Sequence, residues 1–148
     1  MTIILADPNL AVRRGQHKLL DELELSDIHE VKSGKEVIGL LNQGKVRLIV
    51  LGDRLPDAPV NDFIKLLHKK HPSTPIVYCT SDHDMQAAAL VLKTGARNIV
   101  LKPFAPVVFK DKIAKTLGLE EEAKKKEQQA QAQQEKPGKQ PPAPEEKQ

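Results

Sequence analysis

Four short runs of consecutive apolar residues punctuate the first two thirds of the chain, at residues 3–6, 48–51, 76–79 and 99–101. A weaker run lies at residues 28–31. Apolar side chains at successive positions are typical of strands that are buried on both faces, as in a parallel sheet covered by helices. The pattern therefore predicts five buried parallel strands.

Segments with the apolar spacing of a helix follow each of these runs. They lie at residues 9–24, from residue 34 onward, and at residues 63–67, 85–92 and 107–117, and Gly95 and Gly118 are placed to end the last two. The strand–helix order repeats five times. Because crossovers between parallel strands are right-handed, this order predicts a (βα)5 α/β fold, with a doubly wound five-stranded parallel sheet of the flavodoxin kind.

Residues 119–148 differ sharply in composition from the rest of the chain. They are rich in Lys, Glu, Gln and Pro, and Leu119 is their only large aliphatic residue. Such a segment cannot bury a core. We expect one domain at residues 1–118, a helical extension from 119 to about 135 and a disordered end at residues 136–148.

Composition narrows the functional classes. The net charge is only +3, aromatic residues make up 3% of the chain, and the basic residues form no continuous stripe, which argues against nucleic-acid binding. The N-terminus does not have the pattern of a signal peptide, and no apolar run approaches the ~18 residues that a membrane helix needs. Cys79 is the only cysteine, which excludes a disulfide and fits a reducing, cytoplasmic setting.

Polar residues follow the predicted strands and are candidates for a site. They are Asp7 and Pro8, Gly52 and Asp53, Thr80 and Ser81, and Lys102 and Pro103. In an open parallel sheet the ligand site lies beyond the carboxyl ends of the strands, where the strand order reverses. We therefore expect carboxylate, hydroxyl and ammonium groups to converge there.

These residues, in this order, resemble the receiver domain of two-component response regulators, the CheY-like fold. The segments that carry the resemblance are ILADPN at residues 4–9 with Arg13, KSGKEV at 32–37, LIVL at 48–51 with LPD at 55–57, PIVYCTS at 75–81 and GARNIVLKPF at 95–104. Together they cover about residues 2–117.

The resemblance implies a phosphorelay chemistry. A receiver accepts a phosphoryl group from a histidine kinase on an aspartate at the end of the third strand. Acids after the first strand help to hold Mg²⁺, and a hydroxyl and a lysine bind the phosphoryl oxygens. The family also implies a cis peptide bond between Lys102 and Pro103.

This chain keeps only part of that set. Asp7, Thr80 and Lys102 match the first acid, the hydroxyl and the lysine, but Pro8 replaces the second acid. Counting back from Pro56 places Gly52 at the phosphoacceptor position, with Asp53 one residue late. Since successive strand residues face opposite sides, we expect Asp53 to point away or to lie in the loop. A Mg²⁺ site at Asp7 and Asp53 should then be weak or lost.

Several residues have two readings. Lys102 is either a working ammonium or one member of a structural ion pair with Asp7 or Asp53. Thr80 is either a switch hydroxyl or the cap of the following helix. His83, between Asp82 and Asp84, is better interpreted as part of a helix start than as a metal ligand, and Cys79 as a buried strand residue.

We predict a pseudo-receiver that is not an enzyme, needs no cofactor and acts by protein–protein interaction. Its partner, a signalling protein or a kinase, would bind the face made by the fourth helix, fifth strand and fifth helix, about residues 83–117, where homodimerisation is also plausible. Ile99, in place of the family's usual aromatic residue, suggests constitutive binding. One alternative is a phosphoacceptor receiver that uses Asp53 with Mg²⁺. Another is a scaffold whose tail recruits a partner through Pro141, Pro142 and Pro144.

Overall fold

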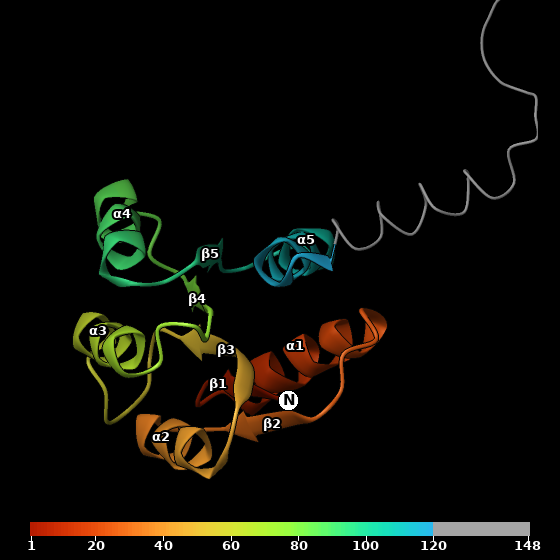
Figure 1. Cartoon of the computed structure of the whole chain (residues 1–148). Coiled ribbons are helices and arrows are strands. Elements are labelled where there is room, and N and C mark those ends of the chain that lie inside the picture. Colours follow the sequence, from red (N-terminus) through yellow and green to blue (C-terminus); the bar gives the residue numbers. More distant parts are fainter. Residues whose placement is uncertain (120–148) are drawn as a thin grey trace, which may run out of the picture. The chain divides into compact units, whose positions relative to one another are not determined.

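The computed structural model describes residues 1–119 and contains five strands that alternate with five helices (Figure 1). The strands are β1 (Thr2–Ala6), β2 (Ile28–Val31), β3 (Val46–Gly52), β4 (Ile76–Thr80) and β5 (Asn98–Leu101). The helices are α1 (Leu10–Glu22), α2 (Gly34–Gln43), α3 (Val60–Lys70), α4 (Met85–Thr94) and α5 (Pro106–Leu117). All strands are parallel, in the order β2-β1-β3-β4-β5, which confirms the predicted doubly wound α/β fold.

The central strands are buried on both faces, as their continuous apolar runs predict. Ile3, Ile4 and Leu5 of β1 are fully buried, and so are Leu48 and Ile49 of β3. Full burial of such a side chain contributes about 1.5–3 kcal/mol. The three central strands therefore form the core against which the loops at their ends are positioned.

The helices cover the sheet in two layers. Helices α1 and α5 pack together on one face, while α3 and α4 pack together on the other, alongside α2 (Figure 1). The strand order reverses between β1 and β3, because β1 leads to β2 on one side and β3 leads to β4 on the other. The carboxyl ends of β1 and β3 therefore flank the crevice where the candidate residues were expected.

Polar side chains fix where the helices begin. Asn9 caps α1 by accepting from the Val12 amide at 3.0 Å, and Asp84 caps α4 by accepting from the Gln86 amide at 2.9 Å. Helix α4 ends at Gly95, whose φ of +150° suits glycine and whose α-carbon packs against His68 of α3. These caps position the two loops that follow β1 and β4.

Contacts along the chain divide it into two units, Met1–Leu117 and Gly118–Gln148. The helical extension and disordered end predicted for residues 119–148 lie, apart from Leu119, outside the described residues. Among the residues that the structure describes, no helix is long and apolar enough to span a membrane.

Candidate functional site

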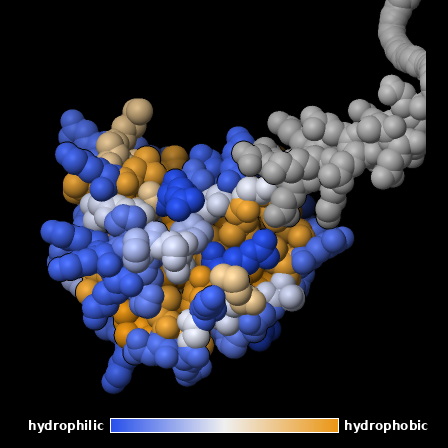
Figure 2. All heavy atoms as spheres, in the orientation of Figure 1, coloured by the Kyte–Doolittle hydropathy of each residue, from blue (hydrophilic) through white to orange (hydrophobic). Residues whose placement is uncertain are grey.

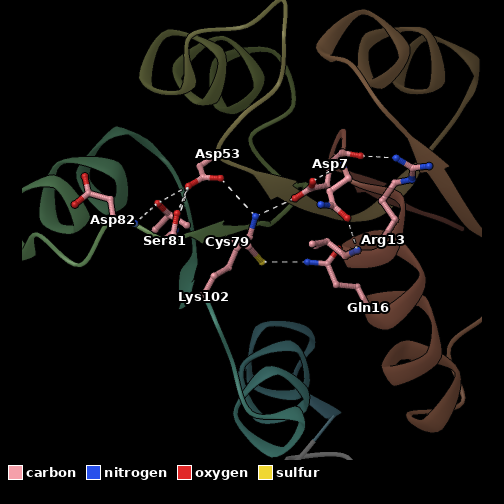
Figure 3. A network of polar contacts seen from close by, with 11 residues as sticks. Asp7, Arg13, Gln16, Asp53, Cys79, Ser81, Asp82 and Lys102 are labelled. Atoms are coloured by element: carbon pink, nitrogen blue, oxygen red, sulfur yellow. Dashed lines mark hydrogen bonds and ion pairs between the residues drawn. The ribbon is translucent and has the colours of Figure 1, made fainter.

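Side chains from four loops and strand ends meet at the carboxyl edge of the sheet (Figure 3). Asp7 follows β1, Asp53 follows β3, Thr80 ends β4 and Lys102 follows β5. Ser81, directly after β4, joins them. The strand ends meet at one edge as the topology predicts, and the structure shows how their side chains pair.

Asp53 is the most heavily bonded group in the cluster. Its Oδ2 accepts hydrogen bonds from the Thr80 hydroxyl at 3.0 Å, the Ser81 amide at 3.0 Å and the Ser81 hydroxyl at 3.4 Å. Its Oδ1 lies 3.4 Å from the Lys102 ammonium. Burial alone would raise the pKa of Asp53, but these hydrogen bonds and the lysine charge outweigh it and lower the pKa below its ordinary value. Asp53 is therefore held as a carboxylate.

The expectation that Asp53 points away from the site is wrong. The residue does lie beyond the strand, because β3 ends at Gly52, but its carboxylate faces Ser81 and Lys102 (Figure 3). It also accepts a hydrogen bond from the Thr80 hydroxyl. The physical reason is the bend that the chain makes at Asp53. The alternation of side chains holds only while the backbone stays extended, so it cannot fix the direction of a residue that follows the strand.

Asp7 forms the other side of the cluster. It is 3% exposed, and its Oδ2 accepts from the Lys102 ammonium at 3.0 Å while its Oδ1 accepts from the Asn9 amide at 2.9 Å. Burial would lower the pKa of Lys102, yet its bond to Asp7 and the two carboxylate charges raise the pKa above its ordinary value. Lys102 is thus a protonated bridge that contacts both Asp7 and Asp53.

Gly52 gives Asp7 the space that it occupies. In the sheet Gly52 pairs with Cys79, and a Cβ built on it would overlap the Asp7 carboxylate, with Asp7 Cγ only 2.9 Å away. A separation below 3.0 Å cannot be accommodated without movement. The lack of a side chain at Gly52 therefore allows Asp7 to reach Lys102.

The carboxylate oxygens of the cluster already have protein partners. Mg²⁺ needs near-octahedral oxygen ligands, commonly supplied by carboxylates and water. All four carboxylate oxygens of Asp7 and Asp53 accept hydrogen bonds from protein donors. The Lys102 ammonium lies between the two carboxylates. Pro8 supplies no carboxylate. Within residues 1–119, no group of three or more His, Cys, Asp or Glu side chains could hold a metal ion.

Thr80 and His83 have roles that the sequence left open. Asp84, and not Thr80, caps α4, while the Thr80 hydroxyl donates to Asp53 and accepts from the Asp82 amide at 3.0 Å. The His83 ring donates from Nε2 to the Lys102 carbonyl at 3.0 Å. The peptide bond between Lys102 and Pro103 is cis, as the family resemblance implied.

Behind Asp7 lies a polar network that sequence reasoning did not find. The Arg13 guanidinium, on α1, donates to the Asp7 carbonyl at 2.7 Å and to Glu30 of β2 at 3.2 Å. The other Glu30 oxygen lies 2.9 Å from His17 Nδ1. No sequence pattern indicates this network, because its members lie on separate elements and meet only in the folded domain.

Cys79 is the buried strand residue that was expected. Burial raises the pKa of its thiol to about 12, and the Gln16 amide lies 3.6 Å from its sulfur (Figure 3). Gln16 is itself buried, and its Oε1 has no hydrogen-bond partner among the described residues. The pair lies beneath the cluster as part of the core and offers no reactive thiolate.

The fold and the cluster define a doubly wound α/β protein with carboxylate, hydroxyl and ammonium groups at its switch point. The response regulator receiver domain family model matches residues 3–114. The chain therefore belongs to the response-regulator receiver family, whose members serve two-component signalling.

The relatives of this chain include chemotaxis proteins. The chain is 27% identical over 121 residues to a chemotaxis protein CheY homolog of Campylobacter jejuni, covering 80% of this chain and 93% of that protein. It is 26% identical over 121 residues to chemotaxis protein CheY1 of Helicobacter pylori, covering 80% of this chain and 98% of that protein. These relatives are thus matched over nearly their whole length.

Solved structures agree on the fold. The signal receiver domain of an HD domain-containing protein from Pseudomonas fluorescens Pf-5 superposes with a TM-score of 0.72 at 20% identity, covering 84% of this chain and 91% of that one. The beryllofluoride-activated NtrC4 receiver domain superposes with a TM-score of 0.74 at 20% identity, covering 79% and 96%. At this identity the likeness carries the fold alone.

Proposed function

We propose that this receiver domain works as a protein-interaction module whose output does not depend on phosphorylation. One observation carries the proposal. The Asp53 carboxylate already accepts hydrogen bonds from the Thr80 hydroxyl, the Ser81 amide and the Lys102 ammonium. In this proposal the domain has no enzymatic activity and no resident metal. It works in the cytoplasm with a protein partner and without nucleic acid.

The chemistry of phosphoryl transfer supports this reading. During transfer, the donors around a nucleophilic carboxylate bind the oxygens of the incoming phosphoryl group. Here the donors bond to the carboxylate itself. Gly52 stands at the acceptor position and cannot react, and Pro8 removes an acid that would help to hold a metal. Each difference from the family's pattern acts against transfer.

The partner-binding face that we propose is formed by α4, β5 and α5, about residues 83–117. Apolar side chains reach the surface on all three elements, and they are Met85, Leu90, Leu92, Leu101, Val107 and Val108. Figure 2 shows apolar atoms at the surface over α4 and beside α5. A protein partner, such as a signalling protein or kinase, or a second copy of this domain would cover this face.

Phosphorylation tests the proposal directly. The protein is incubated with acetyl phosphate and Mg²⁺, and its intact mass is measured. We expect no added phosphoryl group, whereas a CheY-type receiver in the same buffer should gain one. An added group that is lost in Asp53→Ala but retained in Asp62→Ala, a carboxylate of α3 outside the cluster, would refute the proposal.

A second candidate function is favoured by one observation. The Asp53 carboxylate lies 3.4 Å from the Lys102 ammonium and 3.0 Å from the Thr80 hydroxyl, so the two donors of a phosphoryl site surround it. We propose as the alternative that Asp53 accepts the phosphoryl group with Mg²⁺ held in part by Asp7. The mass measurement distinguishes the two functions.

A further inference from the structure

We propose that Asp53 is an internal anion that holds the loop between β4 and α4, and through it the first turn of α4, in one arrangement. The inference deepens the proposed function and rests on it, since it explains how the α4 face is kept ready for a partner without phosphorylation. It concerns an oxyanion-binding site that the chain fills with its own carboxylate.

The hydrogen-bond donors around Asp53 form an oxyanion-binding site. The Thr80 hydroxyl, the Ser81 amide and the Ser81 hydroxyl converge on one oxygen, and the Lys102 ammonium faces the other. The Asp53 side chain is only 12% exposed. Hydrogen bonds to a charged acceptor in such a place are about twice as strong as neutral ones. Without the Asp53 carboxylate, the Thr80 hydroxyl, the Ser81 amide and the Ser81 hydroxyl would lose this acceptor, while Lys102 would keep its bond to Asp7.

A relay of hydrogen bonds leads from this site to α4. The Thr80 hydroxyl gives its single proton to Asp53 and accepts from the Asp82 amide at 3.0 Å. Asp82 Oδ1 accepts from the Asp84 amide at 2.9 Å, and Asp84 Oδ1 accepts from the Gln86 amide at 2.9 Å. Each link fixes the orientation of the next. The Thr80 hydroxyl keeps its orientation because Asp53 accepts its proton.

A second connection joins the same loop to Lys102. The Lys102 ammonium contacts Asp53, while the Lys102 carbonyl accepts from His83 Nε2 at 3.0 Å. Side chain and backbone of one residue therefore connect the anion to the middle of the loop. The loop is held at its start by Asp53 and in its middle by the Lys102 carbonyl, so loss of the Asp53 carboxylate should loosen residues 81–86 together.

Chemical rescue tests this inference. In Asp53→Ala the carboxylate is missing, and formate, which has the size of the lost group, is the probe. Backbone amide NMR signals are compared in sodium formate and in sodium chloride at equal ionic strength. We expect the amides of Ser81, Asp82, Asp84 and Gln86 to shift in the variant and to return toward their wild-type positions, in a saturable manner, with formate.

The controls separate a local effect from a general one. Wild type and Asp62→Ala should show no saturable shift at residues 81–86, because Asp53 fills the site in both proteins. Asp53→Asn, a closer isostere, should shift the same amides without responding to formate. Unchanged loop amides in Asp53→Ala, or shifts that formate does not reverse, would overturn the inference.

The two proposals fail in different ways. Phosphorylation of Asp53 would refute the proposed function, which the mass measurement detects without formate. If formate does not reverse the shifts in Asp53→Ala, the role of Asp53 as an internal anion is refuted. The mass measurement of phosphorylation is unaffected by that outcome. Rescue together with an unphosphorylated wild type is the outcome that we expect.

Discussion

The α-carbon of Gly52 lies against the carboxylate of Asp7, so that a Cβ at residue 52 would be 2.9 Å from Asp7 Cγ. A glycine at the end of β3 and an acid at the end of β1 thereby share one space. The Asp7 carboxylate occupies this space when it bonds to Lys102. A side chain at residue 52 would overlap the carboxylate in that position.

Gly52→Ala should therefore destabilise the domain although it adds a single methyl group. The methyl displaces the Asp7 carboxylate from Lys102, and overpacking of this kind costs about 1–3 kcal/mol. Urea unfolding followed by circular dichroism measures the change. The matched control is Gly15→Ala in the exposed middle of α1, where a Cβ meets nothing within 4 Å and stability should rise by up to about 1 kcal/mol. Equal effects in the two variants would contradict the overlap.

Removal of the bridging ammonium should be costly. In Lys102→Met the carboxylates of Asp7 and Asp53 lose the cation between them, and breaking a largely buried pair from one side costs about 3–5 kcal/mol. We expect a loss near the lower limit, because the Lys102 side chain is 19% exposed. Lys110→Met, which breaks an exposed bridge to Glu22, should cost less than about 1 kcal/mol. A comparable small loss for Lys102→Met would show that the bridge is not a structural element.

The lowered pKa of Asp53 predicts a pH dependence of stability. A group whose pKa is lower in the folded than in the unfolded chain stabilises the fold above its ordinary pKa of 3.8 and loses that contribution as the pH falls through the lowered value. The stability difference between wild type and Asp53→Asn should therefore be constant near neutral pH and shrink below about pH 4. Urea titrations from pH 6 to pH 3 measure it. A difference independent of pH would mean that the ionised carboxylate is not what stabilises the site.

Cys79 should be unreactive until the protein unfolds. Its thiol is fully buried, and burial raises its pKa to about 12, so almost no thiolate exists at pH 8. A thiol reagent such as 5,5′-dithiobis(2-nitrobenzoate) should label the native protein very slowly and the urea-unfolded protein at the rate of an ordinary thiol. Rapid labelling of the native protein would place Cys79 at an accessible surface.

The fold followed from the sequence because the determinants of a parallel sheet are local. Runs such as residues 48–51 and 76–79 are apolar at every position, and both prove to be buried on both faces. The strand ends could be placed at one edge from topology alone. Topology alone therefore predicts that Asp7, Thr80 and Lys102 lie at one edge of the sheet.

The direction of the Asp53 side chain could not be predicted in the same way. Strand alternation extends only to Gly52, and the bend that follows depends on donors from β4 and β5, more than 25 residues away. The Arg13–Glu30 bond and the contact of His83 with the Lys102 carbonyl also join residues on separate elements, 17 and 19 residues apart. Such contacts can be identified only in a three-dimensional structure, because no short segment of sequence contains both partners.

We propose that Asp53 already accepts hydrogen bonds from the donors that a phosphoryl group would need. A crystal structure grown with Mg²⁺ and beryllofluoride tests it most directly, since beryllofluoride binds the acceptor carboxylate of a working receiver. We predict an Asp53 carboxylate still bonded to Thr80, Ser81 and Lys102, with no beryllium on it. A beryllium–oxygen bond at Asp53, with the Thr80 hydroxyl and the Lys102 ammonium turned to the fluorides, would contradict the account.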